Sequence, residues 1–434
     1  MSAEAVRGQG VPVGGVGATS SPEAVRGQGE PVRGVSVGDR VEARAPGKVN
    51  LYLGCGGRLP DGYHLLDTVF LAVDLEERGS ATLLGTEPVW IGSEPGPAGA
   101  AAGAVGALPN WLEVSFAGQG SEQLAVDATN LVVRAAVALA THLGYALPTR
   151  IEVEKRVPIA AGMAGGSADA ALTLRALNEL WAAGLDLDQL TALGRRLGAD
   201  VPFGLVGGLA HAGARGDEPV AMAALPGAPQ LHLAFFASPL GLSTPAVFGE
   251  FDRANEFDRA SEFDRASEFD RANESDRASE ATGVDDAADA AAPRVAPAAL
   301  LEAARAGDAA ALAGLIANDL QAPALRLRPE LERTIAAAHE AGALRAFVSG
   351  SGPTIAALCS SREHAEQVAA AVTAALGEDE LGYPLRAVVA SGPVPGASAT
   401  STGPGAGTDV PGGASVALTA GGVPGARTRI DEEN

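Results

Sequence analysis

Alternating and helical hydrophobic patterns follow one another in the middle of the chain and predict a strand, a turn and a helix. Residues 150–154, Arg-Ile-Glu-Val-Glu, alternate apolar and polar side chains, which is typical of a half-buried strand. Residues 168–181 carry leucine, alanine and tryptophan among good helix formers, which predicts a helix. The run Val-Asn-Leu-Tyr-Leu at residues 49–53 predicts a second strand, and residues 298–318 predict another helix. The chain is therefore expected to mix strands and helices.

The segment between that strand and helix is rich in glycine. Val157 to Ala171 read Val-Pro-Ile-Ala-Ala-Gly-Met-Ala-Gly-Gly-Ser-Ala-Asp-Ala-Ala. A glycine turn that opens a helix leaves backbone N–H groups free beside the positive end of the helix dipole, which suits a phosphate. The glycines alone leave open a tight turn that binds nothing. No lysine follows them as in a Walker A loop, and no Gly-x-Gly-x-x-Gly fingerprint with a suitable downstream acid occurs.

Composition excludes several classes of function. The 434 residues are 47% hydrophobic, enough for a core, and the net charge of −22 argues against nucleic-acid binding. Cys55 and Cys359 make neither a disulfide framework nor a zinc site, and the histidines lack metal-ligand spacing, so no structural metal is expected. No apolar run approaches the ~18 residues of a membrane helix, and residues 1–44 lack a signal-peptide core. These features predict a soluble, cytoplasmic protein without a membrane partner.

Both ends of the chain have the composition of disordered segments. Residues 2–10 recur almost unchanged as residues 21–29, within a Gly/Pro/Val-rich leader that we assign to residues 1–40. Residues 392–434 are rich in Gly, Ala, Thr and Pro and show no apolar periodicity. Neither segment can bury enough surface to offset the entropy of ordering it, so both are predicted to be disordered. A misplaced translation start is an alternative account of the leader.

A hexapeptide repeat, first seen as Glu-Phe-Asp-Arg-Ala-Asn at residues 250–255, interrupts the second half of the chain. Residues 250–290 contain fourteen acids and five arginines, a net charge of −9. Its phenylalanines would spiral around a helix and form no buried stripe. The segment is predicted to be an acidic linker, disordered or transiently helical, with a partner-binding arm as the alternative.

Three segments together resemble the GHMP kinases, small-molecule kinases named after galactose, homoserine, mevalonate and phosphomevalonate. The order Pro-x-x-x-Gly-x-x-Gly-Gly-Ser-x-Asp-Ala-Ala resembles their ATP loop, Ala45–Leu53 resembles their opening signature, and Phe347–Thr354 resembles their third motif. Asp-Gly-Tyr-His at residues 61–64 resembles the branch acting on a cytidine diphosphate-linked methylerythritol in the non-mevalonate isoprenoid route. Residues 130–136 and 197–203 match the same branch.

This resemblance implies an α+β fold of two lobes with the active site in the cleft between them. The N-terminal ATP-binding domain would span residues 41–222 and the C-terminal domain residues 223–391, with the repeat as an insert. The implied third-motif loop is Gly350, Ser351 and Gly352. The implied ATP contacts are Pro158, Ile159, Ala160, Ala161, Gly162, Met163, Ala164, Gly165, Gly166, Ser167 and Ala168.

Two residues depart from the family's ATP loop. Ala164 stands where many relatives carry glycine. Because alanine disfavours a positive φ, residue 164 is expected to have a negative one. Ala168 stands where a second serine is common, which removes one hydroxyl from the phosphate or Mg²⁺. Ser167 is assigned a phosphate contact, and Asp169 is assigned a structural role, because a Ser–x–Asp pair at a helix start is a capping arrangement.

Two residues are candidates for catalysis. Asp200 lies in the apolar context Leu-Gly-Ala-Asp-Val-Pro-Phe, which suits either a partly buried general base or a residue that caps a turn before Pro202. Lys48, at the start of a predicted strand, would by itself be taken as a solvated charge. The resemblance places Asp200 at the catalytic aspartate and Lys48 at its partner, which polarises the substrate hydroxyl.

The resemblance also implies a substrate pocket. Asn50 would contact the substrate hydroxyl from the same strand face as Lys48. His64, beside Tyr63, would hydrogen-bond the cytosine edge, since a neutral imidazole offers one donor and one acceptor. Phe248 would stack on cytosine, and the same segment supplies Thr244. Without the resemblance, the histidine and the phenylalanine could equally be a surface residue and an apolar anchor.

The implied activity is ATP-dependent phosphorylation of the 2-hydroxyl of the methylerythritol moiety, with Mg²⁺ expected and its ligands undetermined. One alternative is another small-alcohol kinase of the superfamily, for homoserine or mevalonate. A second is a catalytically inactive binding protein with the same fold. Neither the oligomeric state nor a role for the repeat follows from the sequence.

Overall fold

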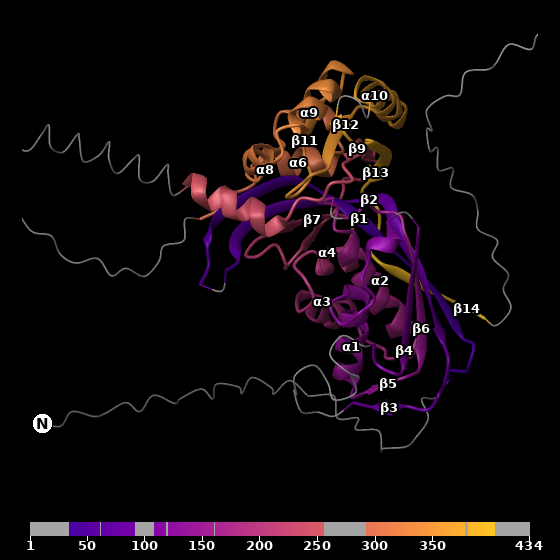
Figure 1. The fold of residues 1–434 in the computed structure, drawn as a ribbon. Helices are drawn as coiled ribbons and strands as arrows, with labels where there is room; N and C mark the ends of the chain where they lie inside the picture. The colour runs from indigo at the N-terminus through magenta and orange to yellow at the C-terminus, as the bar shows by residue number, and fades with distance from the viewer. Residues whose placement is uncertain are drawn as a thin grey trace, which may run out of the picture.

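The chain folds into two lobes joined by two long strands (Figure 1). Strands β1 (Arg40–Arg58) and β2 (His64–Leu83) pair along most of their length and run from the lower lobe into the upper one. The structure is a computed structural model, and it describes residues 34–60, 62–91, 108–118, 120–159, 161–255, 292–377 and 381–403.

The lower lobe is built on the larger sheet. Its strands run in the order β10-β1-β2-β6-β4, with β14 added beside β1 and the pair β7 and β8 added beside β2. A two-stranded ladder and one 3-10 turn complete the lobe. The further bounds are β4 (Leu112–Gly118), β6 (Thr149–Lys155), β7 (Leu209–Ala212), β8 (Val220–Met222), β10 (Ala317–Asn318), β14 (Ser398–Thr402), β3 (Val89–Trp90), β5 (Tyr145–Ala146) and η1 (Ser121–Gln123).

Helices cover one face of this sheet, and a first hydrophobic core lies between them and the strands (Figure 1). The helices are α1 (Leu131–Leu143), α2 (Gly165–Leu180), α3 (Leu187–Arg195) and α4 (Val201–Val206). The alternation that predicted a strand at residues 150–154 is confirmed in β6, whose residues are alternately buried and exposed. The helix predicted from residue 168 is also confirmed, although α2 begins at Gly165.

The upper lobe carries an antiparallel sheet in the order β11-β12-β9-β13. Helices α9 and α10 pack on it around a further hydrophobic core. The bounds are β9 (Leu231–Ala237), β11 (Arg345–Val348), β12 (Ile355–Cys359), β13 (Arg386–Gly392), α6 (Ala298–Ala306), α7 (Ala309–Ala313), α8 (Gln321–Leu327), α9 (Leu331–Glu340) and α10 (Arg362–Ala375). The fold is thus the α+β, two-lobed architecture that the sequence implied.

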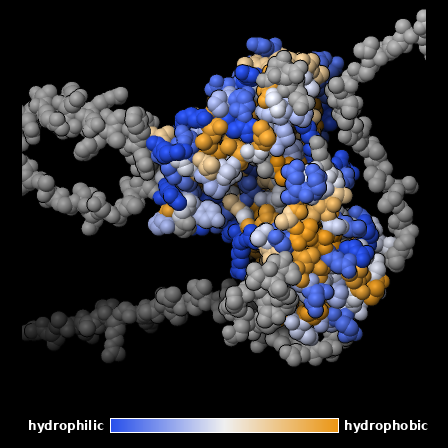
Figure 2. All heavy atoms as spheres, in the orientation of Figure 1, coloured by the Kyte–Doolittle hydropathy of each residue, from blue (hydrophilic) through white to orange (hydrophobic). Residues whose placement is uncertain are grey.

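A shared core joins the lobes and ties the site to both. Val49 and Leu71, from β1 and β2, pack in one buried cluster with Phe235 and Phe347 of the upper sheet. Because β1 and β2 contribute to the cores of both lobes, the loops at their junction are held from two sides. The space-filling view is hollowed between the lobes (Figure 2).

Two sequence-based expectations about the fold are wrong, and a third, that the repeat is an acidic linker, disordered or transiently helical, does not describe its ordered first copy. The tail does not start at residue 392, because Ser398–Thr402 forms β14 and pairs antiparallel with β1. The helix predicted over residues 298–318 is interrupted at Gly307, which has a φ of 64°, and is divided into α6, α7 and β10. Residues 250–255, the first copy of the repeat, are helical in continuity with residues 244–249. Residues 1–33, 256–291 and 404–434, which include most of the leader, the repeat and the tail, lie outside the described residues.

Candidate active site

The glycine-rich loop connects the end of β6 to the first turn of α2. Helix α2 begins at Gly165 without a side-chain cap, so its first N–H groups are not consumed by a capping side chain. The expectation that Ser167 and Asp169 form a capping arrangement is therefore wrong. The expectation about Ala164 is also wrong: it has a φ of 59°, in the left-handed region that favours glycine. Ala160 lies outside the described residues.

A buried charge cluster holds the start of α2 against the sheet. Lys155 Nζ donates to Asp169 Oδ2 at 2.6 Å and also to Glu77 Oε1, and all three side chains are almost fully buried. Glu77 Oε2 accepts from the backbone N–H of Arg156 at 2.8 Å. Burial raises the pKa of Glu77, and burial together with the nearby Glu77 charge raises the pKa of Asp169 to about 7, against the opposing effect of Lys155. Asp169 thus has a structural role, as expected, but it acts through this charge cluster and not through a helix cap.

The third-motif loop of the upper lobe packs directly on the glycine-rich loop. Ser349 Oγ donates to the carbonyl oxygen of Gly162 at 3.3 Å. A Cβ on Gly162 would collide with the Ser349 carbonyl oxygen, and its φ is 71°, so only glycine fits this crossing. A Cβ built on Gly350 would lie 3.3 Å from Lys48 Nζ. The two loops and the lysine therefore meet at one place.

Lys48 and Asp200 come together across the lower lobe. Lys48 Nζ lies 3.7 Å from Asp200 Oδ2 and donates to Asn50 Oδ1 at 2.6 Å. Asn50 in turn donates to Thr68 Oγ1 at 2.8 Å, which fixes the orientation of its amide. The Lys48 side chain is 7% exposed and Asp200 is 33% exposed, so the carboxylate faces the open side of the pair. Lys48 Nζ also lies 5.6 Å from the centre of the Phe70 ring.

Local backbone geometry explains how these side chains are aimed. The pairing of β1 with β2 shifts register between Pro46 and Gly47 and again between Asn50 and Tyr52. Such bulges redirect side chains beside functional sites. Asp200 occupies the N-cap position of α4, but its side chain makes no capping hydrogen bond. The alternative role for Asp200 as a capping residue is not supported by this geometry.

His64, at the start of β2, lies against the helix of residues 244–255. Its ring stacks on Phe248 with centroids 4.6 Å apart, and Phe251 meets it edge-on at 6.1 Å. His64 Nε2 lies 2.7 Å from Asp252 Oδ1. Tyr63 is 58% exposed, with the Arg215 guanidinium 5.2 Å from the centre of its ring. The structure thus places the predicted pyrimidine-reading residues together, with Phe248 covered by the imidazole.

The same helix is also linked to the third-motif loop. Thr244 Oγ1 lies 2.9 Å from Ser351 Oγ. The chain therefore brings together most of the predicted site residues from both lobes.

Sequence reasoning missed four residues of this region: Glu77, Lys155, Phe251 and Asp252. Lys155 carries a local signal, because it is a charged residue at an inward position of an alternating strand. Asp252 was missed because the repeat was treated as one unit. The i, i+4 spacing from Phe248 to Asp252 would have placed both on one face of a helix.

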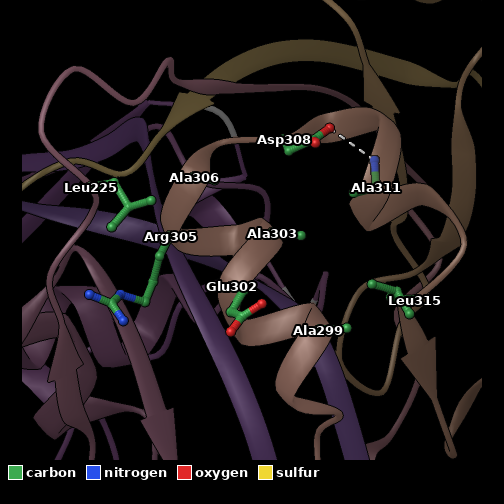
Figure 3. A pocket seen from close by; sticks show the side chains of 9 residues that line it. All are labelled: Leu225, Ala299, Glu302, Ala303, Arg305, Ala306, Asp308, Ala311 and Leu315. Atoms are coloured by element: carbon green, nitrogen blue, oxygen red, sulfur yellow. Dashed lines mark hydrogen bonds between the residues drawn. The ribbon is translucent and has the colours of Figure 1, made fainter.

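A separate depression of about 550 Å³ lies between α6 and α7. Figure 3 shows its lining, where the Asp308 side chain accepts a hydrogen bond from Ala311 N. None of its lining residues belongs to the site described above. Among the described residues, no three His, Cys, Asp or Glu side chains gather as a metal centre. Within the same ranges, no helix has the length and apolar character needed to cross a membrane.

The convergence of a glycine-rich loop that opens a helix, a second glycine loop and a Lys–Asp pair in a two-lobed α+β fold defines a small-molecule kinase of the GHMP type. The GHMP kinases N terminal domain family matches residues 130–209, and the GHMP kinases C terminal family matches residues 300–378. The chain belongs to the 4-diphosphocytidyl-2-C-methyl-D-erythritol kinase family, as its similarity to the curated relatives of that name shows.

The relatives cover most of the chain. A 4-diphosphocytidyl-2-C-methyl-D-erythritol kinase from Nocardia farcinica (strain IFM 10152) is 41% identical over 358 residues, which are 82% of this chain and 95% of the relative. One from Mycolicibacterium gilvum (strain PYR-GCK) is 39% identical over 360 residues, 82% of this chain and 92% of the relative. A crystal structure of 4-(cytidine 5'-diphospho)-2C-methyl-D-erythritol kinase is 28% identical, with a TM-score of 0.53, and covers 81% of this chain and 98% of its own.

Proposed function

We propose that this chain transfers the γ-phosphoryl group of ATP to the 2-hydroxyl of 4-diphosphocytidyl-2-C-methyl-D-erythritol, a step of non-mevalonate isoprenoid biosynthesis. Family membership over more than four fifths of the chain supports the activity. The observation that carries the proposal is the position of the Lys48–Asp200 pair. The pair adjoins the third-motif loop, and that loop also packs on the glycine-rich loop.

Asp200 is proposed as the general base and Lys48 as its electrostatic partner. As the substrate oxygen attacks the γ-phosphorus, the bond to the β–γ bridging oxygen breaks and the hydroxyl proton passes to a carboxylate oxygen. Asp200 is the more exposed member of the pair, which suits a group that must reach substrate. Lys48 is held by Asn50 at 2.6 Å and can stabilise the developing alkoxide without moving far. The amide oxygen of Asn50 accepts the hydrogen bond from Lys48, so a contact between Asn50 and substrate would use the amide nitrogen.

ATP binding is proposed at the glycine-rich loop. The uncapped first turn of α2 offers backbone N–H groups from Gly165, Gly166 and Ser167 to phosphate oxygens. Mg²⁺ stays a prediction. It is usually held by substrate phosphates, water and one or two carboxylates, so the lack of a three-acid cluster among the described residues fits a metal that arrives with ATP. No step of the proposed mechanism passes through it.

The substrate's pyrimidine is proposed to bind beside Tyr63, His64 and Phe248. Because His64 already covers one face of Phe248, cytosine must use the other face or displace the imidazole. Thr244, hydrogen-bonded to Ser351, lies between this pocket and the third-motif loop and is proposed to line the diphosphate path. A cytoplasmic location and the absence of nucleic-acid partners remain predictions that rest on composition and on the net charge of −22.

A comparison of turnover tests the assignment. Purified chain should convert 4-diphosphocytidyl-2-C-methyl-D-erythritol with MgATP and should leave homoserine and mevalonate essentially unreacted, as followed by ADP release and product mass. Turnover of homoserine or mevalonate at a comparable kcat/KM would reassign the substrate. Lack of turnover with all three, together with tight binding of the cytidyl compound, would favour a binding protein.

A further inference from the structure

The first copy of the hexapeptide repeat supplies an acid to the pyrimidine pocket. Asp252 Oδ1 lies 2.7 Å from His64 Nε2, although the two residues are 188 positions apart. The side chains are 26% and 5% exposed, so water competes little at the imidazole. At this distance a carboxylate oxygen accepts a hydrogen bond from the N–H group of a neutral imidazole. His64 is therefore oriented by a residue outside the segment Asp-Gly-Tyr-His.

The helix that carries Asp252 is anchored on both sides of the contact. Phe248, Phe251 and Asp252 follow i, i+3, i+4 spacing and therefore share one helix face, the face that meets His64. Beyond that face, Glu250 Oε1 accepts from Arg326 Nε of α8 at 2.7 Å. The stacked ring, the edge-on ring and the carboxylate fix the imidazole in three directions.

We propose that Asp252 is a positioning residue that sets the tautomer of His64 and so the base specificity of the pocket. With the proton held on Nε2 by the carboxylate, Nδ1 is left as a hydrogen-bond acceptor. An acceptor matches the 4-amino group of cytosine. The same acceptor would be repelled by the 4-carbonyl oxygen of uracil, because the lone pairs of the two atoms would face each other. This inference rests on the proposed function, because it assumes that His64 faces the base.

The consequence is a preference for cytidine over uridine nucleotides that depends on a residue of the repeat. Because the Asp252 contact is made at Nε2, Nδ1 is the ring nitrogen that is proposed to meet the base. Mispairing a buried acceptor with another acceptor forfeits the hydrogen bond and leaves both groups desolvated. We expect cytidine diphosphate to bind about tenfold to a hundredfold more tightly than uridine diphosphate.

The test uses the full chain and titrates cytidine diphosphate and uridine diphosphate by calorimetry. Asp252→Ala should weaken cytidine diphosphate binding and bring the preference close to one. Asp252→Asn keeps the shape but lets either amide atom face Nε2, so the preference should fall there too. Arg253→Gln is the matched control, because Arg253 lies on the same helix with 67% of its side chain exposed and pairs only with Glu250 among the described residues. It should keep the wild-type preference.

Nitrogen-15 NMR of the imidazole gives a second readout that a purely structural role would not move. The wild-type spectrum should show His64 protonated at Nε2, and Asp252→Ala should show a mixture of tautomers. A wild-type ring protonated at Nδ1, or an Asp252→Ala variant with the full cytidine preference, would overturn the inference. If the wild-type chain fails to phosphorylate the cytidyl substrate, the proposed function fails instead. If the wild type is active but Asp252→Ala keeps both its nucleotide preference and its His64 tautomer, the tautomer role alone is refuted.

Discussion

Lys48 Nζ lies 3.7 Å from Asp200 Oδ2 but only 2.6 Å from Asn50 Oδ1. The lysine is thus held by the amide and remains within electrostatic reach of the carboxylate without being locked to it. This arrangement leaves Asp200 able to accept a proton from substrate while the ammonium charge stays in place. The ion pair joins β1 to the residue that precedes α4, so two separate motifs of the sequence meet in the proposed catalytic pair.

The first prediction concerns this pair. Asp200→Asn should lower kcat by roughly two to four orders of magnitude, the usual contribution of a general base. Binding of cytidine diphosphate should change little, because His64 and not Asp200 faces the proposed base pocket. Steady-state kinetics with calorimetry would separate the two effects. Near-normal turnover in a folded Asp200→Asn protein would remove Asp200 from the role of base.

A second prediction concerns the strained residue at the start of α2. Ala164 has a φ of 59°, which costs alanine about 1 kcal/mol relative to glycine. Ala164→Gly relieves this strain, but it also adds roughly 0.4–1 kcal/mol of unfolded-state entropy. We therefore expect the free energy of unfolding to stay the same or rise slightly.

Ala168→Gly is the matched control, because Ala168 lies inside α2, where glycine should cost about 1 kcal/mol. Chemical denaturation would measure both variants. A loss of stability in Ala164→Gly as large as that in Ala168→Gly would show that the left-handed conformation carries no penalty here.

A third prediction follows from the buried cluster of Glu77, Lys155 and Asp169. Burial raises the pKa of Asp169 from 3.8 to about 7, so the folded state binds a proton more tightly than the unfolded state does. By linkage, this group's contribution to stability is fully present below its unfolded pKa and is lost as pH rises to about 7. Asp169→Asn should therefore reduce the decline of the unfolding free energy between pH 3.8 and about pH 7.

At pH 8 the Asp169→Asn protein should be at least as stable as the wild type, because Lys155 and Glu77 then pair one to one. Asp127→Asn offers a control of opposite sign. Hydrogen bonds from Thr129 lower the pKa of Asp127, so its contribution is present above the unfolded pKa and lost as the solution becomes more acidic. Denaturation curves across pH would check both, and an unchanged slope in Asp169→Asn would refute the assignment.

A fourth prediction separates the two parts of the hexapeptide repeat. Residues 256–290, which lie outside the described residues, are predicted from composition to be an acidic linker. Replacing them with a short Gly/Ser join should leave the melting temperature and kcat/KM nearly unchanged, since loop length enters closure entropy only logarithmically.

An excision that begins after Glu250 should instead raise KM for the cytidyl substrate, because it removes Phe251 and Asp252 from His64. Parallel kinetics on the two shortened proteins would distinguish the segments. Equal activity in both would show that the helical copy has no part in the site.

Much of the site could be predicted because its motifs are local. Alternation at residues 150–154 determined β6, and glycines at 162, 165 and 166 determined a turn that opens a helix, since backbone conformation depends on neighbouring residues. The spacing of Lys48 and Asn50 determined that both share one strand face, and their hydrogen bond confirms it. The resemblance of the motifs to a known family then supplied their order in space.

Tertiary structure alone decided which distant side chains meet. The pairing of Ser398–Thr402 with β1, the position of Lys155 between Glu77 and Asp169, and the contact of Asp252 with His64 all join segments far apart in the chain. No local pattern encodes such pairs, because each depends on how complete elements pack and on which charges that packing buries. The left-handed backbone of Ala164 has the same origin. Its conformation is imposed by the loops and sheet around it against the preference of alanine itself.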